Sequence, residues 1–282
     1  LKLIINADDF GRTRGINYGI VEAIKNGVLS STTIMMNMPY AEHAINLAKK
    51  EGITSIGVHL TFIEKSLSLG KTLVDKDGIF KKYPELMKEA DIEEIKTEMR
   101  VQIDKLIDMG IKPTHLDGHH HVHLYSLKMT EAVFAVAKEY DLPVRVGRTG
   151  RTTRTGEEIV IPSFLKTIDL FEDRYYADKV GAEDFKAFVE DAMLYDVVEL
   201  MCHPAFLCTD TLKSSYNYPR LTELDVITSD EIKEFMTSPM TSKHKNSILL
   251  INQDLHELEV SDLDNDRKSK RIQRLWLAVL FG

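Results

Sequence analysis

The chain alternates along most of its length between short apolar segments and longer segments with helical periodicity. The short apolar segments predict strands at 1–7, 28–37, 53–62, 112–121, 142–147, 196–204 and 246–253. The longer segments predict helices at 15–27, 40–52, 92–110, 127–140, 182–194 and 228–238. The clearest helix is 92–110, and its predicted buried stripe is Ile92, Ile95, Met99, Ile103, Leu106 and Ile107.

This repeated strand-then-helix order predicts an α/β fold with a parallel sheet, because the strands read as buried on both faces. Seven to eight parallel strands in about 250 residues favour a TIM-like (β/α) barrel, irregular in places. An open doubly wound sheet is the alternative. No Gly-rich dinucleotide fingerprint and no Walker motif follows a predicted strand, which argues against that alternative. Two longer irregular stretches, 63–91 and 147–181, read as insertions that shape a cleft.

Charge and cysteine content narrow the class of protein. The 282 residues carry a formal net charge of −8, which argues against a nucleic-acid partner. Two cysteines, Cys202 and Cys208, cannot form a disulfide framework and favour a reducing cytoplasm. No secretory signal pattern is visible, and the longest apolar run, 275–281, is far too short to span a bilayer. We therefore expect a cytoplasmic protein that does not associate with membranes.

Half of the ten histidines lie in the stretch THLDGHHHVHL, residues 114–124. Read as a strand, one face would carry imidazole and carboxylate groups and the other would be mostly apolar. Satisfied structural histidines are the alternative interpretation. The groups on the polar parity are His115, Asp117, His119, His121 and His123. Imidazole and carboxylate groups together are typical of a divalent metal site and of acid–base catalysis.

Titratable residues also fall at the ends of other predicted strands. Asp8 and Asp9 end the first, His59 ends the third, and His203 ends the strand 196–204. In a parallel α/β fold the carboxyl ends of the strands meet at one edge, so these groups are expected to converge with Asp117 and His119. Lone histidines elsewhere, such as His43 and His256, are assigned no role.

Two imidazoles and one carboxylate form an open metal site that leaves positions for water and substrate. A second carboxylate can remove a proton from the water, and a separate imidazole can protonate a leaving nitrogen. Such a set predicts metal-assisted hydrolysis of an amide or ester. Adjacent Asp8 and Asp9 point to opposite sides of an extended strand, so the strand must bend for both to reach the cleft.

Several segments resemble the signatures of the YdjC-like carbohydrate deacetylases. They are INADDFGRTRGINYGIVEAIKNGVLSSTTIMMN, GVHL, KPTHLDGHHHVH, ELMCHPAF and YPRLTELDVITS, in order between residues 2 and 253. The last two are similar to late signatures of the chitooligosaccharide deacetylases. The resemblance implies removal of acetate from an N-acetylglucosamine unit of a short, in some cases 6-phosphorylated, chitooligosaccharide, and so a role in chitin degradation. It also implies a distorted TIM-like barrel over 1–253 and a divalent metal given as magnesium.

The resemblance also implies roles for individual residues. The metal ligands would be Asp9, His59 and His119, and the catalytic base would be Asp8. His203 would be the catalytic acid by analogy with other metal-dependent polysaccharide deacetylases. Asp117 would orient an imidazole. A ligand set with two histidines suits zinc or another transition metal better than magnesium, so zinc is the alternative cofactor.

Sugar binding calls for aromatic faces near the strand ends. The candidates are Phe62, Tyr125, Phe206, Tyr216 and Tyr218. Arg220 either meets an anionic group or pairs with Glu223 at the surface. Cys202 lies within an apolar strand and reads as a buried inert thiol rather than a nucleophile.

Two other functions are compatible with the sequence. A glycoside hydrolase would need two carboxylates at a set separation and no metal, which the histidine-rich strand ends argue against. A non-catalytic sugar- or metal-binding barrel would bind without turnover. The segment 254–282, basic and then apolar, matches nothing in the family and reads as a tail that packs on the barrel or forms a subunit interface. A homodimer is expected from the family resemblance.

Overall fold

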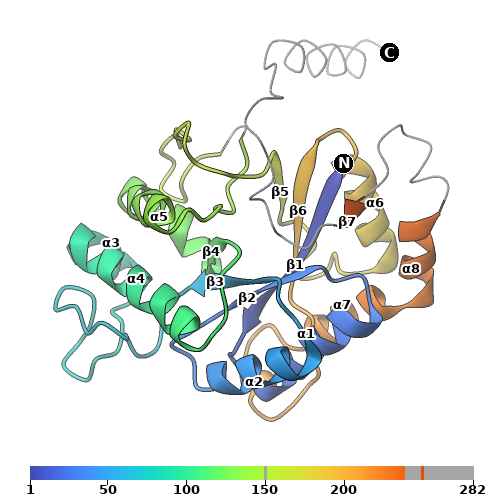
Figure 1. Cartoon of the computed structure of the whole chain (residues 1–282), viewed down its shortest axis with the longest axis horizontal. Helices are drawn as coiled ribbons and strands as arrows, with labels where there is room; N and C mark the ends of the chain where they lie inside the picture. The colour runs from blue at the N-terminus through green and yellow to red at the C-terminus, as the bar shows by residue number, and fades with distance from the viewer. Residues whose placement is uncertain (149–150, 239–248, 251–282) are drawn as a thin grey trace.

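The computed structural model describes residues 1–148, 151–238 and 249–250. The proposed tail, 254–282, lies outside the described residues. Parallel strands form one curved sheet in the order β4-β3-β2-β1-β6-β5, with helices around its outside (Figure 1). The strands are β1 (Lys2–Phe10), β2 (Ser31–Ile34), β3 (Ile56–Leu60), β4 (Leu116–Gly118), β5 (Leu170–Glu172) and β6 (Val197–Cys202). The two-residue β7 (Leu249–Leu250) pairs with the start of β1.

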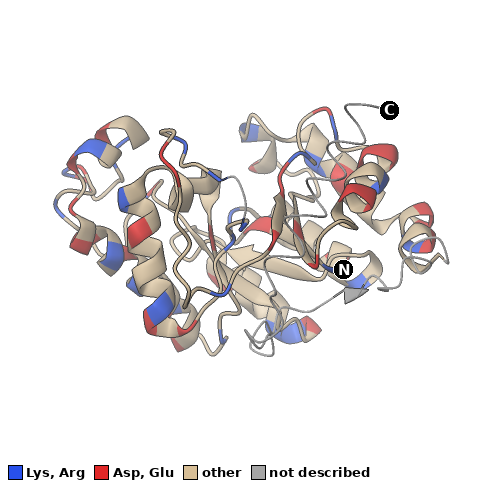
Figure 2. Cartoon of the chain, turned by 90° about the horizontal axis from the view of Figure 1, so that it is seen from above, with Lys and Arg blue, Asp and Glu red and all other residues tan. Residues whose placement is uncertain are grey.

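The helices lie between the strands in the order that the sequence predicts. They are α1 (Arg14–Asn26), α2 (Ala41–Glu51), α3 (Tyr83–Glu89), α4 (Ile92–Asp108), α5 (Leu127–Tyr140), α6 (Ala182–Ala192), α7 (Tyr218–Thr228) and α8 (Asp230–Thr237). Two short 3-10 helices, η1 (His119–Leu124) and η2 (Thr211–Lys213), complete the described elements. Both signs of charge occur on the outer helices (Figure 2). Within the described ranges, every helix is too short or too polar to traverse a lipid bilayer.

The predicted α/β class with a parallel sheet is confirmed, but the strand count of seven to eight is wrong. Among the described residues, six strands form a curled half-barrel that is compatible with a TIM-like barrel, and β7 adds two residues beside β1. The predicted strand 142–147 lies where a further strand would close the ring. It makes single bridges, with Val144 beside Leu116 of β4 and Gly147 beside Ile168, instead of a continuous ladder. The sheet is therefore irregular between β4 and β5.

Local sequence explains where the helices begin and which face they bury. Thr13 caps α1, its hydroxyl accepting from the Ile16 amide at 3.2 Å. Asp91 caps α4 by accepting from the amides of Glu93 and Glu94. On α4 the predicted stripe is buried at Ile95, Met99, Ile103 and Leu106, whereas Ile92 is half-buried. Ile107 is wrong as a stripe member, because it is 44% exposed.

The predicted insertion 63–91 is attached to the barrel by α4. Glu98 is buried and accepts from the Ser68 amide at 2.8 Å and from the Ser66 hydroxyl at 2.6 Å. Gln102, also buried, pairs with the backbone of Thr61, the residue that follows β3. These buried polar groups are satisfied by loop backbone, which fixes the loop that leaves β3. The insertion also contains α3, a helix that the sequence analysis does not predict.

Candidate active site

The carboxyl ends of the strands bring the predicted titratable residues together. β1 supplies Asp8 and Asp9, β3 supplies His59, β4 supplies Asp117, and η1 begins with His119. All five side chains are buried. The register of the sheet sets His59 directly beside Asp117. Parallel strands that end at one edge thus assemble a polar cluster inside an otherwise apolar barrel.

The two adjacent aspartates reach the same interior because the backbone bends at Asp9. Asp9 has φ 72°, the left-handed region that a non-glycine residue seldom adopts. The pairing of β1 with β2 shifts register between Ala7 and Phe10, which brackets this position. The bend that the sequence analysis requires is therefore present, and its strain is held by the sheet on either side.

Asp9, His59 and His119 form a compact set of one oxygen and two nitrogen donors. His119 Nδ1 lies 2.9 Å from Asp9 Oδ1, and His59 Nε2 lies 3.6 Å from the same oxygen. One ligand atom from each residue lies within 4.8 Å of the others, so the triad could hold a metal ion. Among the described residues, His119 Nε2 has no hydrogen-bond partner, and the close approach of His119 Nδ1 to Asp9 Oδ1 lacks hydrogen-bond geometry. Buried polar atoms left without partners are costly, so this set fits a cation better than an empty apolar site.

Two overlapping triads fit a metal less well. Both contain Asp117, one with Asp8 and His59, the other with His115 and Glu199. Asp117 Oδ1 lies 2.7 Å from His59 Nδ1. Its Oδ2 accepts from the Thr33 hydroxyl and lies 2.7 Å from Arg145. Its oxygens are therefore already occupied. The contact with Nδ1 leaves His59 Nε2 directed at Asp9, the arrangement that typically orients a metal-binding histidine.

Arg145 is the centre of charge in the cluster, and the sequence analysis missed it. It is 1% exposed and donates to both oxygens of Asp8, at 2.6 and 2.8 Å. It also donates to Glu199 Oε1 at 2.6 Å. One guanidinium thus pairs with the carboxylates of Asp8, Asp117 and Glu199. The signal in the sequence was an arginine between two valines in a predicted buried strand, where an unpaired charge would be prohibitive.

The acids around Arg145 titrate differently. Burial raises the pKa of Asp8 and of Asp117, but the charges of Arg145 and His59 and the hydrogen bonds to these carboxylates together outweigh burial and hold both pKa values below the usual range. Burial raises the pKa of Glu199 to about 7, and the attraction of Arg145 only partly offsets it. A single guanidinium cannot neutralise three buried carboxylates. Glu199 is therefore the acid that retains a proton near neutral pH, while Asp8 is ionised.

A second wall of the site is built around His203, directly after β6. The His203 amide donates to Glu223, and Arg220 donates to Asp9. The His203 ring contacts the ring of Tyr216 edge-on at 5.6 Å. Burial, with a smaller contribution from the positive charge of Arg220, lowers the pKa of His203 to about 3. The imidazole is therefore neutral at pH 7. Glu223, which one of the two alternatives for Arg220 places at the surface, is buried.

The histidine run does not form the predicted strand with one imidazole face. Strand β4 ends at Gly118, and the 3-10 helix η1 carries the following histidines. His120 and His121 both have φ 53°, so the chain turns sharply after His119. His123 is buried, with Nε2 2.9 Å from the Arg145 carbonyl oxygen, and it supports that segment. The side chains of this run do not alternate between two faces, because the consecutive left-handed residues His120 and His121 interrupt the extended backbone.

The proposed sugar-binding residues occupy different environments. Phe62 is wrong as a sugar platform, because it is fully buried and packs against Phe80. Tyr125 is half-buried beneath the Arg154 guanidinium. Phe206 and Tyr218 are exposed.

Two other side chains are also buried. Arg220 meets a carboxylate, as one of the two sequence alternatives expects, but the carboxylate is that of the buried Asp9 and not Glu223 at the surface. Cys202 is buried, and burial raises the pKa of its thiol well above the usual range, which agrees with an inert thiol.

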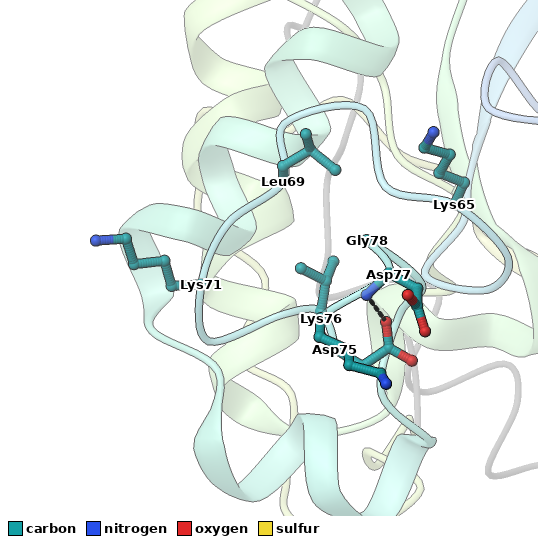
Figure 3. Close-up of a pocket in the computed structure, with 8 residues that line it drawn as sticks. Lys65, Leu69, Lys71, Asp75, Lys76, Asp77 and Gly78 are labelled. Carbon is teal, nitrogen blue, oxygen red and sulfur yellow. Dashed lines mark hydrogen bonds between the residues drawn. The ribbon is translucent and has the colours of Figure 1, made fainter.

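A cavity of about 550 Å³ lies apart from this cluster, in the insertion after β3. Figure 3 shows Lys65, Lys71 and Lys76 around it, with the Asp77 amide donating to Asp75 at 2.9 Å. None of its lining residues belongs to the buried cluster. Flexible lysine side chains in a wide opening do not fix a ligand, so we assign this cavity no role in the chemistry.

The chain is similar in sequence and in structure to known proteins over most of its length. The sequence model of the family described as YdjC-like protein matches residues 2–238. A carbohydrate deacetylase of Clostridium beijerinckii is 41% identical over 84% of this chain and 95% of its own length. The carbohydrate deacetylase of Brevibacillus brevis is 38% identical over 84% of this chain and 94% of its own. A crystal structure from Enterococcus faecalis V583, of a candidate cellobiose-phosphate cleavage protein, superposes with a TM-score of 0.77 at 32% identity. It covers 89% of this chain and 97% of that one.

Proposed function

The chain belongs to the YdjC-like protein family, and from this premise we propose that it is a carbohydrate deacetylase. Its substrate would be an N-acetylglucosamine unit in a short chitooligosaccharide, with or without a 6-phosphate. Relatives that carry the name carbohydrate deacetylase support the class of reaction. The observation that carries the proposal is the buried triad Asp9, His59 and His119 beside the ionised Asp8.

A divalent metal would be held by Asp9 Oδ1 and by one nitrogen each of His59 and His119. When bound, such an ion polarises a carbonyl and lowers the pKa of water. The oxygen–nitrogen donor set suits zinc or another transition metal, whereas magnesium prefers oxygen ligands. Magnesium remains the ion implied by family resemblance. Elemental analysis of the purified protein distinguishes the two.

Asp8 is suited to accept a proton from the attacking water. Arg145 keeps its carboxylate ionised and fixes its orientation through two N–H donors. Asp8 Oδ1 also accepts from the side-chain Nδ2 of Asn6 at 3.0 Å. Asp8 Oδ2 accepts only from Arg145 among the described side chains. We therefore assign the proton-accepting role to Oδ2, which lies 4.0 Å from His59 Nε2.

His203 is proposed to protonate the leaving nitrogen. In the substrate-free site its imidazole is neutral, because burial and Arg220 oppose a positive charge there. A tetrahedral oxyanion on the substrate would add negative charge beside it and favour its protonated form. His203 would then take up a proton from solvent and pass it to the departing amine nitrogen, while Asp8 holds the proton from the attacking water. The Glu223 contact with its amide fixes the turn that carries it.

The decisive test measures acetate release and metal content together. The substrates are N,N′-diacetylchitobiose and its 6-phosphate, with the products analysed for shortened sugar. Asp8→Asn should retain the metal and lose at least about 10³-fold in kcat, and His119→Ala should lose both metal and turnover. Metal added to the apoprotein should raise the melting temperature of the unaltered chain but not of His119→Ala.

His43→Gln is the matched histidine control, because His43 lies on α2 outside the cluster. It should keep metal and activity. Full turnover and stoichiometric metal in His119→Ala would overturn the ligand assignment. A shortened sugar without acetate would favour a glycoside hydrolase, and ligand binding without any turnover would favour a non-catalytic barrel. Sedimentation analysis tests the expected homodimer, and cell fractionation tests the cytoplasmic location.

A further inference from the structure

Two adjacent tyrosines after β5 point in opposite directions. Tyr175 is fully buried, and its hydroxyl donates to the Val180 carbonyl oxygen at 2.9 Å. Tyr176 is 43% exposed, although it lies in the wall that holds His203. The next residue, Ala177, has φ 61°, so the chain turns sharply there. A half-exposed aromatic ring beside a polar cluster offers an apolar face to a ligand.

The ring of Tyr176 is held in place from one side. It stacks on Tyr216 with centroids 4.2 Å apart and an interplanar angle of 14°. The Tyr216 hydroxyl donates to the buried Glu223 and accepts from the Ala177 amide at 3.2 Å. Arg220 lies over the Tyr216 ring at 5.3 Å. Since one face of Tyr176 is covered by Tyr216, its exposed area comes from the other face and the edges.

The Tyr176 ring borders the wall of the site that carries His203. The ring of Tyr176 meets the His203 ring edge-on at 5.5 Å. Burial raises the pKa of the Tyr176 phenol, and the charges of Arg220 and Asp9 also act on it. The phenol is therefore within electrostatic range of the proposed metal ligand Asp9, and its ring contacts that of the proposed acid His203.

We propose that Tyr176 is a substrate-positioning residue whose open face stacks on the pyranose ring that carries the scissile acetamide. The C–H face of a pyranose is apolar and fits a flat aromatic ring. The polar edges of the sugar then remain free to hydrogen-bond with the polar side chains of the site. A ring fixed in advance by Tyr216 loses little conformational freedom when the sugar binds. This inference rests on the proposed deacetylase function and names the residue that holds its substrate.

The test compares Tyr176→Ala, Tyr176→Phe and the control Phe164→Ala. Phe164 is 46% exposed and lies under the Lys138 amine, outside the site. On N,N′-diacetylchitobiose, Tyr176→Ala should raise KM roughly 10-fold with a smaller change in kcat, and Tyr176→Phe should stay within about 3-fold. Phe164→Ala should match the unaltered chain. With the small ester 4-nitrophenyl acetate, which has no sugar ring, all three variants should match it.

Three other outcomes distinguish a failure of the stacking role from a failure of the proposed deacetylase function. An unchanged KM in Tyr176→Ala overturns the stacking role and leaves the deacetylase function intact. An equal loss on the sugar and on the aryl ester also overturns it, because the change would then act on the chemistry. If no N-acetylated sugar is turned over, the function fails. Calorimetric titration with chitobiose then decides: weaker binding by Tyr176→Ala supports the stacking role, and equal or absent binding overturns it.

Discussion

Replacing Arg145 with methionine should destabilise the protein far more than removing an exposed arginine. Arg145 is 1% exposed and lies 2.6–2.8 Å from three buried carboxylates, those of Asp8, Asp117 and Glu199. Removing one partner of a buried ion pair costs about 3–5 kcal/mol, because the other charge stays buried and unpaired. That is a large part of a typical stability of about 5–15 kcal/mol. Methionine fills similar volume, so the cost reports on charge more than on a cavity.

The matched control is Arg100→Met. Arg100 donates to both oxygens of Glu139, at 2.7 and 2.9 Å, with similar geometry on the protein surface. An exposed pair of this kind is worth about 1 kcal/mol or less. Urea unfolding followed by circular dichroism at pH 7 measures both variants. The free energy of unfolding should fall at least about 2 kcal/mol further for Arg145→Met than for Arg100→Met.

The sign of the pH dependence gives a second readout. The folded pKa values of Asp8 and Asp117 lie below the usual 3.8, so their contribution is present above pH 3.8 and lost as the pH falls through the folded values. In Arg145→Met those pKa values rise, and the deficit should be largest at pH 7 and shrink toward pH 4. If Arg145→Met is too unstable to fold, adding Asp117→Asn should recover part of the loss, since Asp117 is one of the ionised carboxylates that Arg145→Met leaves buried and unpaired. Equal stabilities for the two arginine variants within 1 kcal/mol would refute the reasoning.

Two further predictions concern Glu199 and Gly19. Glu199 has a folded pKa of about 7 against an ordinary 4.5, so its contribution is complete below pH 4.5 and lost as the pH rises through about 7. Glu199→Gln should therefore reduce the fall in stability between pH 5 and pH 8 by roughly 3 kcal/mol, measured by urea titration at each pH; an unchanged profile would show that Glu199 is not the titrating acid. Gly19 lies inside α1, where alanine usually adds about 1 kcal/mol. An added Cβ would lie 2.5 Å from the Ala205 Cα, so Gly19→Ala should lower the melting temperature, and a rise would contradict the close approach of α1 to that loop.

Helical periodicity and apolar runs were sufficient to predict most of the fold. The helix 92–110 and the strand 1–7 follow from local patterns, and local patterns survive in the structure as α4 and β1. The sequence analysis missed α7, which begins with a Tyr-Pro pair at Tyr218 and has a weakly amphipathic pattern that periodicity does not detect. It also missed β5, a three-residue strand, because strands this short have no measurable period.

Within the candidate site, residue type at a strand end was the useful signal. Asp9, His59 and His119 could be chosen because the carboxyl ends of parallel strands meet at one edge. The local pattern at Arg145, an arginine between two valines, indicates a buried charge but not its partners, because these lie on three separate strands. The same is true of Glu223, whose contact with the His203 amide depends on how α7 packs.

The left-handed residue at the end of β1 has a consequence for how the site withstands motion. The proposed proton acceptor Asp8 and the proposed ligand Asp9 are joined by one peptide unit, which holds their Cα atoms about 3.8 Å apart. The helices and loops around the curled sheet can shift by small amounts as temperature rises, and the distances between separate elements change with them. The Cα spacing is instead set by bond lengths and the planar peptide, and the two carboxylates are held by their contacts with Arg145 and Arg220, so their spacing should persist when the surrounding barrel shifts.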